Sequence, residues 1–221
     1  MEDGTVRCWG DNSAGQLGQG DTVGRGGTPA TLGAGLPPVD LGGQPATGLF
    51  VRGNTSCTLR ADGTLACWGN NSSGLLLRGA PGNAGDGPGE MGASLSPALL
   101  GTGRTAAVVA LGAGHACALL DDATVKCWGA NTSGQLGQGD TTPRGDASAN
   151  AGNALAPLSL GAGLIPTTLA TSLLSSCALF STGQVKCWGN GGIGELGIED
   201  FKARGNEPGE MGDALPFAEL P

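Results

Sequence analysis

The sequence predicts an all-β repeat protein, and three observations support this fold class. First, the tripeptide Cys-Trp-Gly occurs four times, with spacings of 59, 60 and 60 residues between its cysteines. A fixed period of this length indicates a repeat architecture. Second, short apolar segments alternate with glycine-rich turns, which is typical of short strands. Third, no segment shows a convincing helical period. The four cysteines are Cys8, Cys67, Cys127 and Cys187.

The period divides the chain into a single array of four units, 1–60, 61–120, 121–180 and a truncated 181–221. One small twisted sheet cannot bury both of its faces alone, so neighbouring units must stack. Four-stranded units of this size are typical of propeller blades. We therefore expect a partial β-propeller of about 3.5 blades, built from short antiparallel sheets.

Each unit begins with a short strand that ends in Cys-Trp-Gly, the first of them around Val6 and Cys8. A glycine-rich loop and a longer irregular segment follow, and a short fourth strand closes this part of the unit. Two more strands complete it, in residues 46–60, 106–120 and 166–180. The irregular segments end at Leu36, Leu95, Leu155 and Leu215, and the closing strands end at Leu41, Leu100, Leu160 and Leu220.

The last strand of one unit and the first strand of the next are expected to form a hairpin. If residues 121–123 form its loop, Leu120 pairs with Thr124 and Cys117 lies opposite Cys127. Directly opposed positions on paired strands lie within disulfide range. The same arithmetic places Cys57 opposite Cys67 and Cys177 opposite Cys187. We therefore expect three disulfides, with Cys8 as a free thiol because no cysteine precedes it.

The glycine-rich loops carry a resemblance to a known family. A strand that ends in Trp-Gly is followed by Gly-Gln-Leu-Gly at residues 15–18 and 134–137, and by the near copy Gly-Glu-Leu-Gly at 194–197. The second unit departs from this pattern, with three leucines at 75–77. The pattern resembles the regulator-of-chromosome-condensation repeats. The residues that we expect to be architectural are Trp9, Trp68, Trp128, Trp188, Gly15, Gly18, Gly134, Gly137, Gly194 and Gly197.

The resemblance implies a propeller of seven blades. The founding member of the family is a guanine-nucleotide exchange factor bound to chromatin, and other members bind protein partners through loops at the propeller rim. The cysteine pairs and the segment at 208–212 look like bacterial secreted or surface members. Fewer than four units cannot close seven blades. We expect a piece of a larger propeller or an open arc, rather than half of a homomeric ring, and its open sheet edges could self-associate.

Composition excludes several classes of function. The formal net charge is −8 and the eleven Lys and Arg residues are scattered, which argues against nucleic acid as a partner. No apolar stretch is long enough for a membrane span. The first residues lack the features of a signal peptide. The expected disulfides nevertheless favour an extracellular or cell-surface location, because they require an oxidising environment.

The sequence offers no convincing catalytic, cofactor-binding or metal-binding residues. His115 is the only histidine, and we interpret it as structural, with Ser56 and Ser176 as its counterparts. The cysteines are not arranged in zinc-binding pairs. The glycine-rich loops lack the motif that cradles a phosphate. One aspartate per loop falls short of the ligands that calcium requires; these residues are Asp21, Asp140 and Asp200.

The leading hypothesis is a non-enzymatic scaffold that binds an unknown protein partner. Its binding rim would be the loops 20–36, 78–95 and 140–155, which differ most between units. One alternative is a secreted protein inhibitor of an extracellular hydrolase that uses the same loops. Another is a sugar-binding lectin that uses the recurring tryptophans as stacking platforms. A nuclear exchange factor fits the expected disulfides poorly.

Overall fold

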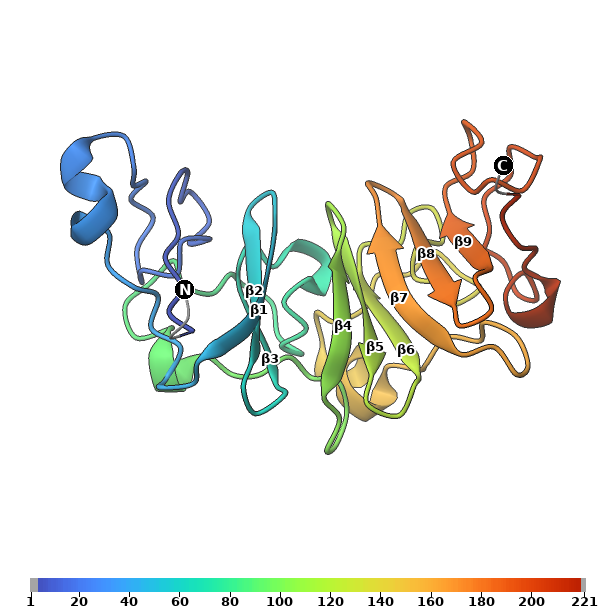
Figure 1. Ribbon diagram of the computed structural model, residues 1–221, viewed down its shortest axis with the longest axis horizontal. Coiled ribbons are helices and arrows are strands. Elements are labelled where there is room, and N and C mark those ends of the chain that lie inside the picture. Colours follow the sequence, from blue (N-terminus) through green and yellow to red (C-terminus); the bar gives the residue numbers. More distant parts are fainter. Residues whose placement is uncertain (1–3, 220–221) are drawn as a thin grey trace.

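The computed structural model describes residues 4–219, which form three antiparallel sheets in a row (Figure 1). Each sheet has three strands in sequential order, and the described residues contain no α-helix. The sheets are β1 (Ala46–Arg52), β2 (Thr55–Arg60) and β3 (Leu65–Gly69); β4 (Ala106–Leu111), β5 (His115–Leu120) and β6 (Val125–Gly129); and β7 (Pro166–Thr171), β8 (Ser175–Phe180) and β9 (Val185–Gly189). The prediction of an all-β, partial propeller is confirmed.

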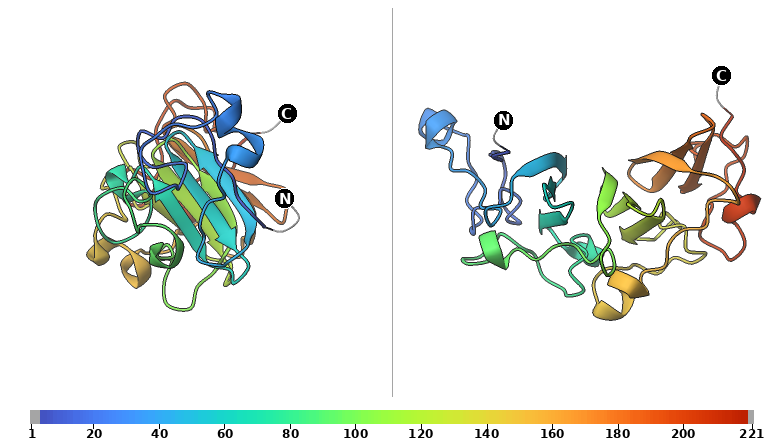
Figure 2. Two further views of the ribbon diagram at one scale, coloured as in Figure 1. Left: turned by 90° about the vertical axis from the view of Figure 1, so that its left-hand side faces the viewer. Right: turned by 60° about the horizontal axis from the view of Figure 1, so that its bottom comes forward.

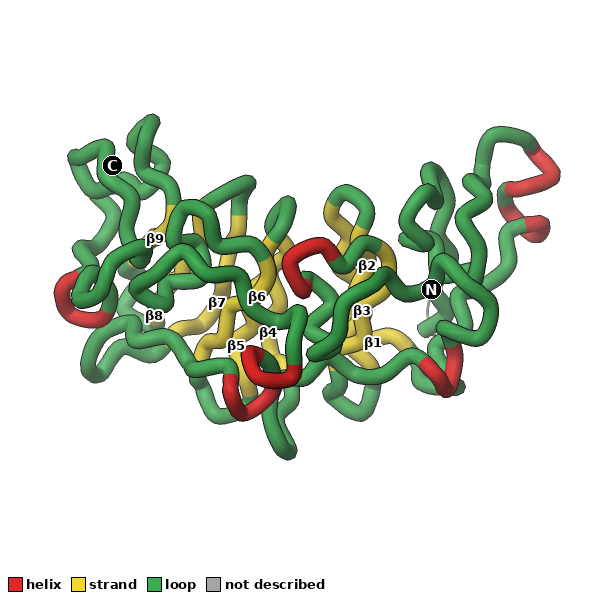
Figure 3. The backbone as a smooth tube through the Cα atoms, turned by 180° about the vertical axis from the view of Figure 1, so that it is seen from behind, coloured by secondary structure: helices red, strands yellow, loops and turns green. Residues whose placement is uncertain are grey.

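The segments before, between and after the sheets are irregular and contain short 3₁₀ turns (Figure 3). These are η1 (Pro29–Thr31), η2 (Gly33–Gly35), η3 (Ser72–Gly74), η4 (Gly92–Ser94), η5 (Ser148–Asn150), η6 (Gly152–Ala154) and η7 (Gly212–Ala214).

The row of sheets forms an open arc, with the two chain ends at its opposite ends (Figure 2). Neighbouring sheets contact each other through β1 and β4, and through β4 and β5 with β7. One apolar core lies between the first and second sheets, and another joins the second sheet to the third. Stacking therefore buries sheet faces that a single unit would leave exposed.

The hairpin register is the expected one. Cys117 pairs with Cys127, and Leu119 pairs with Val125. The backbone N–H of Leu120 donates to the carbonyl oxygen of residue 124 at 2.8 Å and closes the three-residue loop. The other two hairpins repeat this register, with the pairs Cys57–Cys67, Leu59–Leu65, Cys177–Cys187 and Leu179–Val185.

The prediction of a fourth strand in each unit is wrong. The closing segment donates a single backbone hydrogen bond to the third strand, from Ala98 to Leu65 at 2.7 Å in the first sheet. The N–H of Leu100, two residues further on, donates to the carbonyl oxygen of Ala98 at 3.0 Å instead of to the third strand. The corresponding bonds are Val39 to Val6, Leu158 to Val125 and Ala218 to Val185. The predicted end of the last closing strand, Leu220, lies outside the described residues.

Candidate functional site

The tryptophan of each complete sheet contacts the preceding unit. The indole Nε1 of Trp68 donates to the carbonyl oxygen of Gln16 at 3.0 Å. Trp128 makes the same bond to Leu75 at 2.8 Å, and Trp188 makes it to Gln135 at 3.0 Å. All three tryptophans are 0% exposed. Their rings are thus packed between units, and none of the three can stack on a sugar as the lectin hypothesis requires.

The glycines of the loops allow the next unit to approach closely. A Cβ on Gly134 would overlap with the backbone N of Asn206 in the next unit. A Cβ on Gly137 would lie 2.8 Å from Cε of Met211. At Gly194 the nearest atom would be 3.6 Å away, in Phe201. Gly15 and Gly18 face the next unit as Gly134 and Gly137 do, whereas Gly197 has its nearest neighbour, Ala218, at 3.3 Å.

The second unit departs from this arrangement, as its sequence does. Leu77 occupies the position of Gly18 and Gly137; it is fully buried and has a φ of 51°. The next unit carries the small Ala151 where the fourth unit carries Met211. Leu77 and Ala151 belong to the same apolar core. Each of these two interfaces between units therefore pairs one large side chain with one small residue, Leu77 with Ala151 and Met211 with Gly137.

The irregular loops are braced by ion pairs. The guanidinium of Arg25 lies 2.7 Å from the carboxylate of Asp21, and Arg144 lies at the same distance from Asp140. Arg204 pairs with Asp200 in the fourth unit. The hydrogen bond from Arg25 lowers the pKa of Asp21 to about 2. Asp21, Asp140 and Asp200 thus have arginine partners, and no group of three or more potential metal ligands occurs within residues 4–219.

A second brace uses a side-chain oxygen inside each loop. One carboxylate oxygen of Glu90 accepts backbone N–H groups from residues 85, 86 and 87, at 2.9, 3.1 and 2.9 Å. Thr31, Asn150 and Glu210 hold the same place in the other units. The sequence analysis missed these residues, although their spacings of 59, 60 and 60 were a usable signal.

The loop tips between these braces are exposed, apart from the half-buried Gly87, and differ between units. They comprise residues 28–30 (Thr-Pro-Ala), 87–89 (Gly-Pro-Gly) and 147–149 (Ala-Ser-Ala). They lie within the predicted rim loops 20–36, 78–95 and 140–155. The structure thus presents variable tips on a repeated frame.

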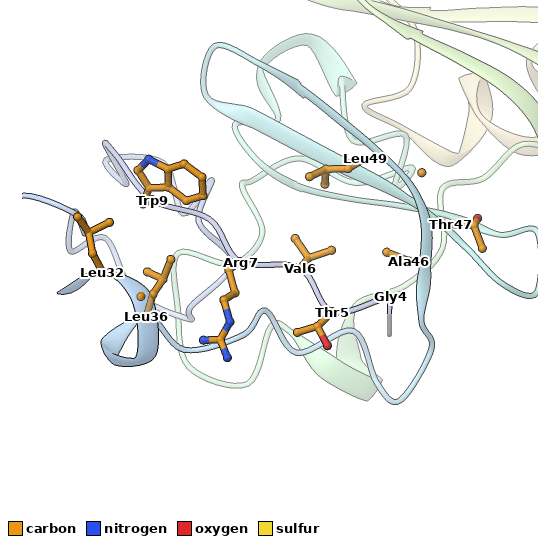
Figure 4. A pocket seen from close by; sticks show the side chains of 12 residues that line it. Gly4, Thr5, Val6, Arg7, Trp9, Leu32, Leu36, Ala46, Thr47 and Leu49 are labelled. Atoms are coloured by element: carbon orange, nitrogen blue, oxygen red, sulfur yellow. The ribbon is translucent and has the colours of Figure 1, made fainter. Parts of the chain in front are cut away.

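A cavity lies at the N-terminal end of the arc (Figure 4). It has a volume of about 630 Å³ and lies between residues 4–9 and strand β1, with Trp9, Leu32 and Leu49 among its lining residues. Trp9 is 63% exposed, in contrast to its three buried counterparts. The ring of Trp9 is therefore not packed in the described residues as the rings of Trp68, Trp128 and Trp188 are.

The cysteines of each hairpin lie at disulfide distance. The Cα atoms are 4.0 Å apart in the pair Cys57–Cys67 and 4.1 Å apart in each of the other two pairs. Cys8 is free and half-buried, and this burial raises the pKa of its thiol.

His115 is a buried residue between the second and third sheets. It pairs with Gly129, as Thr55 and Ser175 pair with the corresponding glycines, so these residues are its counterparts and not Ser56 and Ser176. Its Nε2 lies 2.9 Å from Oγ of Ser176, and burial lowers its pKa to about 4. The sulfur nearest to that hydroxyl belongs to the Cys117–Cys127 pair and is no free nucleophile.

Two buried lysines also escaped the sequence analysis. The ammonium group of Lys126 donates to the carbonyl oxygens of Leu100 and Gly152, each at 2.9 Å. Lys186 makes the equivalent pair of bonds, to Leu160 and Gly212. Each lysine thus attaches the third strand of one sheet to the closing segment of the preceding sheet. In the residues that the structure describes, no helix is long and apolar enough to cross a membrane.

Comparisons with known proteins agree with this architecture. Residues 107–135 match the sequence model of the Regulator of chromosome condensation (RCC1) repeat. Yeast RCC1 (Prp20), solved with Kap60, matches 100% of this chain and 46% of its own, with 21% identity and a TM-score of 0.64. The Prp20p structure from Saccharomyces cerevisiae matches 92% and 45%, with 19% identity and a TM-score of 0.62. Human WBSCR16 matches 94% and 45%, with 19% identity and a TM-score of 0.60.

This chain spans less than half the length of these solved structures. The aligned portion includes all three of its sheets in the yeast comparison, since that match covers the whole chain. Residues 107–135 are therefore similar to a Regulator of chromosome condensation (RCC1) repeat, and the fold of the chain resembles that of part of an RCC1 propeller.

Proposed function

We propose that this protein is a non-enzymatic protein-interaction scaffold that binds its partner through the exposed tips of its irregular loops. The observation that carries the proposal is the combination of a repeated brace with a variable tip. The side-chain cap recurs in all three loops and the ion pair recurs in two of them, whereas residues 28–30, 87–89 and 147–149 differ in sequence. Rigid elements that carry variable surface loops are the usual arrangement of a binding site.

The structural neighbours support a role in protein binding. Yeast RCC1 (Prp20) is bound to Kap60 in its crystal structure, and the Prp20p of Saccharomyces cerevisiae has binding properties toward Gsp1p and histones. Their partners are not transferred to this chain, because identity is about one-fifth and a fold does not determine a partner.

The proposal places the protein outside the cell or at the cell surface. Three cysteine pairs at disulfide distance favour an oxidising environment. The partner would then be an extracellular protein, and a secreted hydrolase remains the alternative target.

A comparison of tip variants tests this function. The wild-type protein and a variant with Gly and Ser at residues 28–30, 87–89 and 147–149 are immobilised and exposed to culture supernatant, and the bound proteins are quantified by mass spectrometry. We expect at least one protein that the wild type retains and the tip variant does not. Residues 28, 87 and 147 donate backbone N–H groups to the caps, and Gly or Ser retains these donors, so circular dichroism and the melting temperature should change little.

Two results would contradict the proposal. Equal retention of the same proteins by both forms would show that the tips are not the binding surface. A hydrolytic activity that copurifies with the wild-type chain and is lost on substitution of His115 would argue for an enzyme.

A further inference from the structure

A groove of about 330 Å³ lies between the first and second units. One wall is formed by the glycine-rich loop and the closing segment of the first unit, and the other by the loop tip of the second unit. The two walls meet where the backbone N–H of Gly92 donates to the carbonyl oxygen of Asp40 at 3.0 Å, beside the green η4 in Figure 1. The lining residues are Gly18, Gln19, Gly20, Pro38, Asp40, Pro88, Gly89 and Met91.

The same set of residues recurs between the third and fourth units, with one exception. The equivalent residues are Gly137, Gln138, Gly139, Pro157, Ser159, Pro208, Gly209 and Met211. Seven of the eight residues are the same, and Ser159 replaces Asp40. The groove of the first two units is therefore distinguished from its copy by a carboxylate.

Between the second and third units the chain places a side chain of its own at this position. Leu99 is the equivalent of Asp40 and Ser159. A Cβ added to Gly79 would lie 3.0 Å from Cδ1 of Leu99, so the leucine contacts the wall formed by the glycine-rich loop. Leu99 is nevertheless 40% exposed with another unit on each side of its own, so neighbouring units do not close this position.

The carboxylate of Asp40 has no cationic partner among the described residues. Its Oδ1 accepts the backbone N–H of Gly42 at 2.9 Å, and within residues 4–219 its Oδ2 accepts no hydrogen bond and joins no ion pair. The carbonyl oxygen of Leu77 accepts the N–H of Leu99 at 2.9 Å, whereas the equivalent carbonyl of Gly18 has no donor in this part of the chain. Two hydrogen-bond acceptors beside the groove are thus available to a ligand.

We propose that this groove is a docking site for an arginine side chain of the protein partner. The proposal rests on the proposed function, because the tip 87–89 contributes to one wall of the groove. A guanidinium group carries only donors, so it complements the free Oδ2 of Asp40 and the free carbonyl of Gly18. The aliphatic stem of an arginine packs on apolar surface, which the prolines and the methionine of the lining provide. The net charge of −8 favours the approach of a basic segment.

The test uses the isotope-labelled, full-length protein and the small probe N-acetyl-arginine N-methylamide. Backbone amide NMR spectra are recorded as the probe is added. We expect concentration-dependent shifts at Gly18, Gly20 and Gly89, and no such shifts at Gly137 and Gly139 of the copy that carries a serine. The uncharged isostere N-acetyl-citrulline N-methylamide should bind about tenfold more weakly or less, because it lacks the charge-assisted hydrogen bond.

Variants copied from the other units test the role of the carboxylate. Asp40→Ser installs the residue of position 159 and Asp40→Leu installs that of position 99, and each should weaken probe binding about tenfold or more. Ser159→Asp should create a second binding site, with new shifts at the amides that line the copy. Asp62→Ser, at an exposed position outside the groove, should leave the affinity unchanged. Melting temperatures show whether each variant remains folded.

Three results would overturn the proposal: equal affinity for the arginine and citrulline probes, equal shifts at the two grooves of the wild type, or unchanged binding by Asp40→Ser. Failure of the proposed function is a separate result. Partner proteins that the tip variant loses but that Asp40→Ser retains in full would disprove the arginine site alone. Equal retention by the tip variant and the wild type would instead disprove binding through the tips.

Discussion

The indole N–H of Trp68 donates a hydrogen bond of 3.0 Å to the carbonyl oxygen of Gln16, which lies 52 residues earlier in the chain. The same bond recurs between each later pair of units. One tryptophan per unit therefore hydrogen-bonds to the backbone of the preceding unit. These bonds make the stability of the units interdependent.

Replacing Trp128 by phenylalanine removes this bond and leaves the carbonyl oxygen of Leu75 buried without its donor. We expect a loss of about 1–3 kcal/mol in the free energy of unfolding, measured by urea denaturation. Trp9→Phe is the matched control, because Trp9 is exposed and should change stability by less than about 0.5 kcal/mol. Equal effects of the two substitutions would contradict the inter-unit role.

Alanine at Gly134 and at Gly194 separates close packing from backbone strain. Both glycines have left-handed φ angles, of 77° and 81°, so both substitutions carry a similar conformational cost. Only at Gly134 does the added Cβ overlap with the next unit. We expect Gly134→Ala to be the more destabilising by about 1–3 kcal/mol, with melting temperatures as the measurement. A larger effect at Gly194 would argue against this interpretation.

Leu77 packs with the small Ala151, whereas the equivalent positions in the next interface hold a glycine and a methionine. We expect that the first pair can be replaced by the second only when both residues are changed. Leu77→Gly empties a buried site and should cost about 3 kcal/mol or more. Ala151→Met overfills the same core and should cost about 1–3 kcal/mol. The double variant recreates the pairing seen between Gly137 and Met211. A double-mutant cycle should therefore show a favourable coupling of about 0.5–3 kcal/mol, and simple additivity would refute the exchange.

Burial of His115 predicts a dependence of stability on pH. Its folded pKa is about 4, against an ordinary value of 6.5. As the pH falls from about 6.5 to about 4, the unfolded chain takes up a proton that the folded chain does not, so folding stability decreases across this window. Below it, both states carry the proton and the loss stops.

The matched variant is His115→Ser, which installs the residue of the equivalent position, Ser175. Wild type should lose up to a few kcal/mol more than the variant between the two ends of the window, measured as the difference in unfolding free energy. Parallel pH profiles for the two proteins would show that His115 does not titrate in this way.

Thiol titration tests the cysteine pairs. In denaturant without reductant, one thiol should react, that of Cys8, and reduction should raise the number to seven. The double substitution Cys117→Ala and Cys127→Ala should lower stability by about 2–3 kcal/mol, since the closed loop is short. Seven reactive thiols without reductant would remove the argument for an oxidising location.

The sequence alone determined the local structure. The period, the alternating apolar residues and the loop arithmetic were sufficient to predict the hairpins and to place Cys117 opposite Cys127, because hairpin register depends on residues close together in the chain. The four-stranded blade failed for an equally local reason. The closing segment makes a single backbone hydrogen bond to the third strand, because the N–H of Leu100 turns back to Ala98, and a pattern of apolar residues does not reveal this turn.

Only the tertiary structure decided what the repeated residues do. Trp9 and Trp128 share one motif, yet one is exposed and the other is packed, because burial depends on whether another unit lies against the ring. The carbonyl partners of Lys126 and the side-chain cap at Glu90 also depend on backbone directions in the folded loops. The sequence predicted what each unit looks like, and contacts between units determined which of its surfaces are free to bind.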